Sequence, residues 1–320
     1  MVQHIGAGIT GTIGTGEGGG RLAKPMSATL THSKIGAVPL ERADDVQYRE
    51  CKILLKAGLF AKPSSFHKFW KTVHRTAKKL GIAMTRPEKP VALHLREVVF
   101  LDTPKFRLYN NHFILRKRTF YRHGRPEPNF ELTLKLRSPD RNIAAAVDVR
   151  PLLPCVNIVK FKEELLPLSD KLGGLRTIYS HGCELDTPNL VLTQRFETIC
   201  QVFPALMKAG AKAETRLNEV NEMIVDETLA NLGMLEFDSK TIAKANIAIW
   251  RNHHTRADLI GEFSFQMKFE RLEELRRKPR ERSEEFFRQL QVNAEEWIQL
   301  GTTKTSLIYR LGKVPVVNHE

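Results

Sequence analysis

Basic and apolar side chains alternate along two stretches in the middle of the chain. In the stretch HFILRKRTF, Arg116 and Arg118 fall on one face of an extended strand, and Leu115 and Lys117 fall on the other. In FELTLKLRS, Lys135 and Arg137 share one face and leucines occupy the opposite face. The pattern therefore predicts two neighbouring strands that each have an apolar face and a cationic face.

A third stretch, VQYRECKILLK, has the same period of two. It places Glu50, Lys52 and Lys56 on one face, with Ile53 and Leu55 behind them. A solvated outer face would account for any one of these rows alone. Three rows that share the pattern, one of them with an acid, favour a β-barrel whose interior is lined with charge.

The other elements follow from the same kinds of periodicity. Helical spacing of aromatic residues predicts a helix over 64–80. A short helix is predicted over 160–172, and a helix interrupted at Pro279 is predicted over 269–299. Strands are predicted over 46–56, 94–101, 106–108, 112–121, 129–137, 143–150, 190–202, 213–226, 232–237, 242–251 and 258–269. Antiparallel meanders with a helix after the first strand and another near the end predict an α+β barrel.

The chain divides into a tail, a folded domain and a short end. Residues 1–44 are rich in Gly, Thr and Ser and have little periodicity, which predicts a flexible N-terminal tail. One folded domain is expected over 45–312, followed by a C-terminal tail over 313–320.

Composition and charge narrow the choice of partners. A net charge of +14 favours polyanions such as nucleic acid, anionic lipid or phosphate-rich small molecules, and 42% hydrophobic residues suffice for a sizeable core. No window approaches the length of a membrane span and the start lacks an apolar signal core, so a cytoplasmic protein without membrane association is expected. The four cysteines are far apart, which predicts reduced, packed thiols.

Cationic rows that converge inside a barrel require a partner. Buried cations lose hydration and repel one another, so the interior must hold water, carboxylates or a bound polyanion. A chain of phosphates suits such a site, because each charge-assisted hydrogen bond is worth roughly 1.5–3 kcal/mol. Hydrolysis would further need a divalent metal on carboxylate oxygens.

The chain resembles the CYTH, or triphosphate tunnel metalloenzyme, superfamily over residues 46–312, and most closely its inorganic triphosphatase members. The motifs that carry the resemblance are Glu50-Cys51-Lys52, Phe100-Leu101-Asp102-Thr103-Pro104 with Leu108, Leu115-Arg116-Lys117-Arg118, Leu132-Thr133-Leu134-Lys135, Arg150, Arg195, Asp226, Glu262 and Lys304. The resemblance implies an eight-stranded antiparallel β-barrel, or tunnel, with flanking helices. It also implies a triphosphate-type substrate and Mg²⁺ or Mn²⁺ as cofactor.

Carried over residue by residue, the resemblance assigns roles to the basic and acidic motif positions. The phosphate-binding set that it implies is Lys52, Arg116, Arg118, Lys135, Arg150, Arg195 and Lys304. The metal set that it implies is Glu50, Asp226 and Glu262. Glu50 and Glu262 would orient the metal or the attacking water, with Lys52 beside them as the third catalytic residue. Asp102 is expected to cap a turn.

The acidic half of the family pattern is thinned in this chain. Tyr48 and Leu152 stand where the family has Glu, and Ser264 and Gln266 follow Glu262 where further Glu residues are usual. Acids outside the motifs would compensate only if they faced inward. These acids are Asp148, Glu197, Glu219 and Glu222. A thinned carboxylate set weakens divalent-cation affinity and leaves the interior more positive.

Several functions remain open from the sequence. The first is a divalent-metal-dependent hydrolase of inorganic tripolyphosphate or of a nucleoside or thiamine triphosphate. The second is a catalytically weak tunnel that binds polyphosphate or nucleotides. A nucleic-acid-binding protein is a lesser alternative, because no interleaved aromatic and basic motif of an RNA-binding module is present. Cyclisation of ATP is a minor alternative, and a homodimer is left open.

Overall fold

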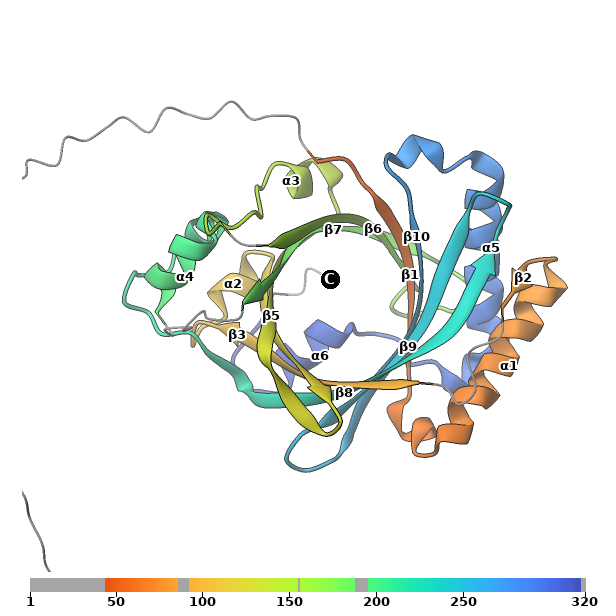
Figure 1. Cartoon of the computed structure of the whole chain (residues 1–320), viewed down its shortest axis with the longest axis horizontal. Coiled ribbons are helices and arrows are strands. Elements are labelled where there is room, and N and C mark those ends of the chain that lie inside the picture. Colours follow the sequence, from red (N-terminus) through yellow and green to blue (C-terminus); the bar gives the residue numbers. More distant parts are fainter. Residues whose placement is uncertain (1–43, 86–91, 155, 188–194, 318–320) are drawn as a thin grey trace, which may run out of the picture. The chain divides into compact units, whose positions relative to one another are not determined.

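The structure is a computed structural model that describes residues 44–85, 92–154, 156–187 and 195–317. Its strands close into a barrel with helices around it (Figure 1). The predicted N-terminal tail, apart from Asp44, lies outside the described residues, as do the last three residues of the predicted C-terminal tail.

Ten strands are present in the described part of the chain. They are β1 (Tyr48–Leu55), β2 (Ala83–Met84), β3 (Leu93–Asp102), β4 (Phe113–Arg122), β5 (Arg125–Ser138), β6 (Asn157–Leu166), β7 (Arg176–Thr187), β8 (Asn218–Glu236), β9 (Ile242–Asn252) and β10 (Asp258–Lys268). The α-helices are α1 (Pro63–Lys79), α2 (Arg107–Asn110), α3 (Arg141–Ala145), α4 (Phe196–Val202), α5 (Arg277–Asn293) and α6 (Lys304–Arg310). The 3-10 helices are η1 (Ala57–Phe60), η2 (Pro204–Ala209), η3 (Leu272–Glu274) and η4 (Glu295–Trp297).

Nine strands form the barrel, in the order β8-β3-β4-β5-β7-β6-β1-β10-β9, and β9 pairs with β8 to close it. The short strand β2 adds to β8 outside the ring. All pairs in the ring are antiparallel except β1 with β6, which run parallel. The barrel is therefore mixed and nine-stranded, which corrects the expectation of eight antiparallel strands.

The strand β6 occupies most of the segment that was predicted as a helix over 160–172. Its sequence NIVKFKEELL alternates with a period of two, so Lys160 and Lys162 face inward while Phe161 is buried on the outer side. The acidic pair Glu163-Glu164 interrupts the apolar spacing and hides this alternation. β6 is the strand that joins β7 to β1 and completes the ring.

Three predicted strands contain short helices and no strand where the structure describes them. The segment 106–108 begins the short helix α2, and 143–150 begins in α3, whose first turn is capped by the Asp140 carboxylate accepting from the Asn142 N–H. The described part of 190–202 is α4. Each segment mixes small and apolar residues without a clean period of two, so packing against the barrel decides its conformation.

Two other boundaries differ from the prediction. The predicted segments 213–226 and 232–237 are parts of one long strand, β8, which begins only at Asn218, ends at Glu236, and is irregular at Asn221 and again near Gly233. The predicted helix over 269–299 begins as α5 only at Arg277, and Pro279 lies in its first turn, where the missing N–H costs no hydrogen bond.

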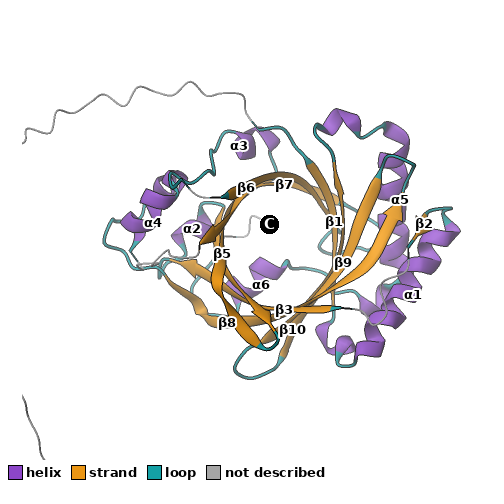
Figure 2. Cartoon of the chain, in the orientation of Figure 1, coloured by secondary structure: helices purple, strands orange, loops and turns teal. Residues whose placement is uncertain are grey.

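Helices cover the outer face of the barrel on two sides (Figure 2). The predicted aromatic stripe of α1 is buried, and it packs with α5 against β1, β9 and β10 through residues such as Phe69, Phe263 and Phe286. A second apolar cluster joins α3, α4 and η2 to the outer faces of β4, β5 and β7. The apolar cores therefore lie mainly outside the ring, which leaves its interior to polar side chains.

A third apolar cluster fills one end of the barrel interior. Ile308 and Tyr309 of the helix α6 pack in this cluster with Phe100 and Trp250 of the wall. The Tyr309 ring stacks on Tyr109 with 4.0 Å between the ring centroids. In the described part of the chain, no helix is both long enough and apolar enough to cross a membrane.

Asp102 joins α6 to the wall of the barrel. The buried carboxylate accepts from the N–H groups of Thr103, Leu108 and Tyr109, and from the Tyr309 hydroxyl at 3.1 Å. It thus caps the turn after β3, as predicted. It also fixes α6, which carries Lys304.

Replacing Asp102 by Ala is expected to lower the free energy of unfolding by about 2–3 kcal/mol, because buried donors lose their acceptor. Denaturant unfolding measures the change. Asp186→Ala is the control, since that aspartate is exposed at the end of β7. Equal unfolding midpoints for the two variants would contradict the assignment of Asp102 as the anchor of α6.

Candidate functional site

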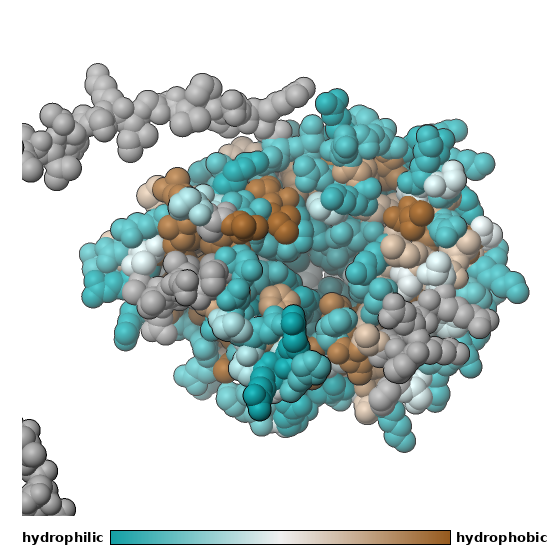
Figure 3. All heavy atoms as spheres, in the orientation of Figure 1, coloured by the Kyte–Doolittle hydropathy of each residue, from teal (hydrophilic) through white to brown (hydrophobic). Residues whose placement is uncertain are grey.

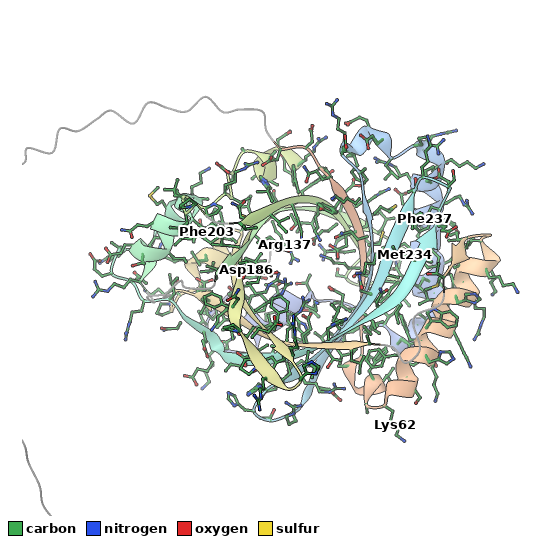
Figure 4. The ribbon with its side chains drawn as sticks, viewed as in Figure 1. Lys62, Arg137, Asp186, Phe203, Met234 and Phe237 are labelled. Carbon is green, nitrogen blue, oxygen red and sulfur yellow. The ribbon has the colours of Figure 1, made fainter. Side chains whose placement is uncertain are left out.

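The barrel encloses a cavity of ≈ 610 Å³, which we call the lumen. Figure 3 shows a hollow in the middle of the barrel that is surrounded mainly by hydrophilic residues. In Figure 4, Arg137 lies inside the ring of strands, whereas Phe203 and Phe237 lie outside it. Twelve basic side chains line the lumen: Lys52, Arg96, Arg116, Arg118, Lys135, Arg137, Lys160, Lys162, Arg176, Lys244, Lys304 and Arg310. Five carboxylates accompany them: Glu50, Glu131, Glu184, Glu227 and Glu262.

The strand faces are as the alternation predicts. On β4, Arg116 and Arg118 line the lumen, while the Lys117 ammonium lies over the Phe130 ring on the other face, 5.0 Å from the centroid. On β5, Lys135 and Arg137 line the lumen. Together with β6, these strands form the most strongly basic part of the wall.

Glu164, on the inner face of β6, holds three of the basic side chains in place. Its buried carboxylate lies 2.8 Å from the Lys52 ammonium, 3.4 Å from Arg137 and 3.8 Å from Lys135. Burial raises its pKa, but Lys52, Arg137 and Lys135 outweigh burial and hold the pKa of Glu164 well below its ordinary value. Burial would lower the pKa of Lys52, but Glu164 and Glu50 raise it to about 12. The Glu164 carboxylate and the Lys52 ammonium are therefore both charged at neutral pH.

Glu227 anchors a second cluster near α6. It is buried and accepts from Arg96, from the Trp250 indole N–H at 2.8 Å and from Lys304 at 3.4 Å. Burial raises its pKa, but Lys304 and Arg96 dominate and lower the pKa of Glu227 well below its ordinary value. Arg96 on β3 lies directly opposite Glu227 on β8 in the strand register.

The predicted metal ligand Asp226 lies outside the lumen, one position before Glu227. Adjacent residues of a strand point to opposite faces. The Asp226 carboxylate contacts the His253 ring at 2.7 Å and the Arg256 guanidinium. Glu227 shares the inner phase of β8 with Leu229, so Glu227 and not Asp226 lines the lumen.

Arg116 is a basic side chain of the lumen whose charge is poorly compensated among the described residues. Its contact there is with the Thr133 hydroxyl at 3.4 Å, its Nε has no hydrogen-bond partner, and no carboxylate lies within ion-pair distance. Burial lowers the pKa of Arg116 to about 9, with Arg118 and Arg96 adding to the effect. A guanidinium with this pKa is still charged at neutral pH, so Arg116 presents a positive charge that a bound anion would stabilise.

The other sequence-predicted residues divide between the lumen and the outside. Glu50 contacts Lys162 at 3.0 Å and Glu262 contacts Lys304 at 2.9 Å, all within the lumen. Arg150 lies in a loop outside and pairs with Asp44 at 2.6 Å.

Arg195 is exposed outside the lumen and pairs with Glu197 at 3.4 Å. The four acids that the sequence offered as compensation do not line the cavity in the described part of the chain; they are Asp148, Glu197, Glu219 and Glu222.

Several lumen residues escaped the sequence analysis, above all those on β6. The resemblance expects a basic residue followed two positions later by Glu, and it leads to Arg150 with Leu152 after it. On β6, Lys162 and Glu164 have that spacing and both turn inward. The others are Arg96, Glu131, Lys160, Arg176, Glu184, Glu227, Lys244 and Arg310.

The carboxylates of the lumen do not form a ready metal centre. Within the described ranges, no three His, Cys, Asp or Glu side chains are grouped so as to hold a metal ion. Glu50 pairs with Gln266 and Leu54 pairs with Glu262, so the two predicted ligands are four positions apart along β1 and β10. At about 3.3 Å per residue this is roughly 13 Å. The donor set therefore does not fit the metal that the resemblance implies.

The fold and the lumen define a tunnel-like β-barrel protein with a cationic interior. No protein-family model matches the chain, and no curated protein sequence matches it. An adenylyl cyclase candidate from Hippeastrum, described as having a dominant triphosphatase activity, is 11% identical over 86% of this chain and 100% of its own, with a TM-score of 0.40.

Two further solved structures show comparable similarity. A protein from Pyrococcus horikoshii OT3 is 12% identical over 82% of this chain and 99% of its own, with a TM-score of 0.34. An adenylate cyclase candidate from Bacillus halodurans is 12% identical over 82% of this chain and 97% of its own, with a TM-score of 0.33.

Proposed function

We propose that the protein binds a triphosphate-type small molecule in the lumen: inorganic tripolyphosphate, or the phosphate chain of a nucleoside or thiamine triphosphate. The observation that carries this proposal is the excess of basic over acidic side chains in an enclosed cavity, with Arg116 lacking a carboxylate partner there. A buried guanidinium without a counter-ion is unfavourable, and a bound phosphate oxygen relieves that cost. The sequence motifs of the triphosphate tunnel superfamily support the same ligand.

The arrangement of the basic wall suits a chain of phosphates better than a single anion. Arg116 and Arg118 on β4 adjoin Lys135 and Arg137 on β5, so cations follow one another along the lumen. Arginine binds phosphate oxygens with two parallel N–H groups, and lysine supplies a compact charge. A chain of two or three phosphates can therefore meet several cations at once.

Binding is expected to be accompanied by proton uptake at Lys135. Burial lowers the pKa of Lys135 well below its ordinary value; Glu164 opposes this, and Lys52 and Arg137 add to it. A bound phosphate chain raises the pKa of Lys135 again. At a pH between the pKa of Lys135 in the free protein and its pKa in the complex, the protein therefore takes up a proton on binding. Calorimetry in two buffers of different ionisation enthalpy measures the uptake, at a pH where tripolyphosphate is fully deprotonated.

Lys135→Met is expected to remove the uptake, and Lys117→Met, on the outer face of β4, is the matched control. If wild type and Lys135→Met exchanged the same number of protons, Lys135 would not be the group that responds to the ligand.

Metal-dependent hydrolysis of the same ligand, with Mg²⁺ or Mn²⁺, is the second candidate. The superfamily motifs imply this reaction, and both predicted catalytic acids, Glu50 and Glu262, line the lumen, although they lie four positions apart along β1 and β10. Phosphate release from tripolyphosphate, ATP and thiamine triphosphate, with and without each metal, tests it beside a binding titration in EDTA. Fast metal-dependent release that is lost in Glu50→Gln supports hydrolysis, whereas tight binding without release supports the binding function alone.

A further inference from the structure

Two lysine ammonium groups of the lumen each lie between two carboxylates. The Lys52 Nζ is 2.8 Å from Glu164 and 3.3 Å from Glu50. The Lys304 Nζ is 2.9 Å from Glu262 and 3.4 Å from Glu227, and it also lies 4.7 Å from the centroid of the Trp250 ring. In both places one compact cation bridges oxygens that come from two different strands.

A bridged pair of carboxylates is the arrangement that hard divalent cations use in proteins. Here the oxygens already accept from an ammonium group, so a metal ion would have to displace a lysine that is itself buried. Displacing it would also place a dication beside the basic wall, since Arg96 and Arg118 act on Glu227 as well. Both effects oppose metal entry.

The remaining carboxylates are paired in the same way. Glu131 accepts from Arg118, and Glu184 accepts from Lys160. Burial raises the pKa of Glu184, but Lys160, Arg118 and Arg116 together lower it to about 2. Burial likewise raises the pKa of Glu50, and Lys162 and Lys52 bring it down to about 2. These acids are therefore ionised at neutral pH and neutralise neighbouring cations.

We infer that Lys52 and Lys304 are built-in cations that fill the carboxylate pairs of the lumen, and that the lumen binds the free phosphate chain and not its magnesium complex. The inference rests on the proposed function for its ligand, but the placement of the lysines is tested without any phosphate. It predicts that Mg²⁺ competes with the protein for tripolyphosphate, because the complexed chain carries less negative charge to the basic wall.

The first experiment removes one built-in cation. Lys304→Met keeps an unbranched side chain of similar length and leaves Glu227 and Glu262 facing each other without an ammonium group. We expect this variant to bind one Mn²⁺ ion, detected by loss of the free Mn²⁺ signal in electron paramagnetic resonance. Wild type and Lys304→Arg, which restores a cation, are expected to bind none at this place. Mn²⁺ binding by wild type with the same affinity as Lys304→Met would overturn the inference.

The second experiment keeps the wild-type chain, so it does not depend on the folding of a variant. Tripolyphosphate is titrated into the full-length protein in EDTA and again with Mg²⁺ in excess over the ligand. The expected result is tight binding in EDTA and an apparent affinity about tenfold weaker or more with Mg²⁺. Binding that Mg²⁺ strengthens would overturn the inference and leave the proposed function standing. Absence of binding under both conditions would overturn the proposed function. The Mn²⁺ experiment would still test whether a lysine ammonium group occupies the place of a metal ion between the carboxylates.

Discussion

Replacing Glu164 by Gln is expected to lower the free energy of unfolding by about 3–5 kcal/mol, the usual cost of breaking a buried ion pair from one side. The substitution leaves Lys52, Lys135 and Arg137 crowded together without their shared carboxylate. Tripolyphosphate is expected to restore part of the loss, because its oxygens supply the missing negative charge to the same cations. Chemical denaturation with and without tripolyphosphate measures both effects.

The pH dependence of this loss has a definite sign. The pKa of Glu164 is held well below its unfolded value of 4.5, so the carboxylate contributes its full stabilisation above that pH. The contribution falls as pH decreases below 4.5 towards the folded pKa, and wild type and Glu164→Gln should converge there. Glu285→Gln, an exposed position on α5, is the matched control and should change stability by about 0.5 kcal/mol or less. A Glu164→Gln protein as stable as this control at neutral pH would contradict the assignment of Glu164 as the shared counter-ion.

Arg116→Ala is expected to weaken tripolyphosphate binding about 10- to 100-fold, because it removes a charge-assisted contact worth roughly 1.5–3 kcal/mol. The same change should leave the stability of the free protein unchanged or slightly higher, because a buried cation without a carboxylate partner is removed. Arg116→Ala is thus expected to lower the affinity for tripolyphosphate without lowering the free energy of unfolding, whereas Glu164→Gln is expected to lower the free energy of unfolding. Titration calorimetry and denaturant unfolding on the same preparations measure the two quantities.

Lys117→Ala provides the control for Arg116→Ala within the same strand. Its side chain lies on the outer face of β4, over Phe130, so tripolyphosphate affinity should stay as in wild type. Equal losses of affinity in both variants would indicate that the overall positive charge of the protein, and not the lumen, attracts the ligand.

Much of the basic wall could be predicted because strand alternation is a local property. Lys135 sits in a run where leucines alternate with polar residues, and Arg116 and Arg118 are two positions apart and so share a face. The two strands that carry these residues pair with each other as a hairpin. Lys52 and Glu50 follow from the same rule on β1. The charged interior of the barrel was therefore visible before any tertiary contact was known.

The number of strands and the acidic partners could not be predicted in this way. The pairing of β1 with β6 is parallel and joins segments more than a hundred residues apart, so no turn signal announces it. A helix over 160–172 would not place Lys162 and Glu164 on the same face of a sheet as Glu50. The sequence motif points to Asp226, whereas Glu227 lines the lumen. The reason is similar, because the phase of a strand decides which of two adjacent acids turns inward.

The position of Lys304 depends on a long-range event. The helix α6 returns from the end of the chain into the barrel and is fixed there by Asp102 and by the Asn221 amide, which donates to the carbonyls of Ile308 and Tyr309. The sequence motif identified Lys304, but the bridge from its ammonium group to Glu227 and Glu262 exists only in the closed barrel. For this reason the built-in cations emerge from the structure and not from the sequence.

The most direct test of the central claim is a calorimetric titration of tripolyphosphate in EDTA into three proteins. They are wild type, the lumen variant Arg116→Ala/Lys135→Ala, and the surface variant Lys68→Ala/Lys71→Ala, which alters the exposed basic face of α1. We predict a single binding site in wild type and in the surface variant, with affinity lost by about a hundredfold or more in the lumen variant. Equal binding by all three proteins, or loss only in the surface variant, would contradict a phosphate-binding lumen.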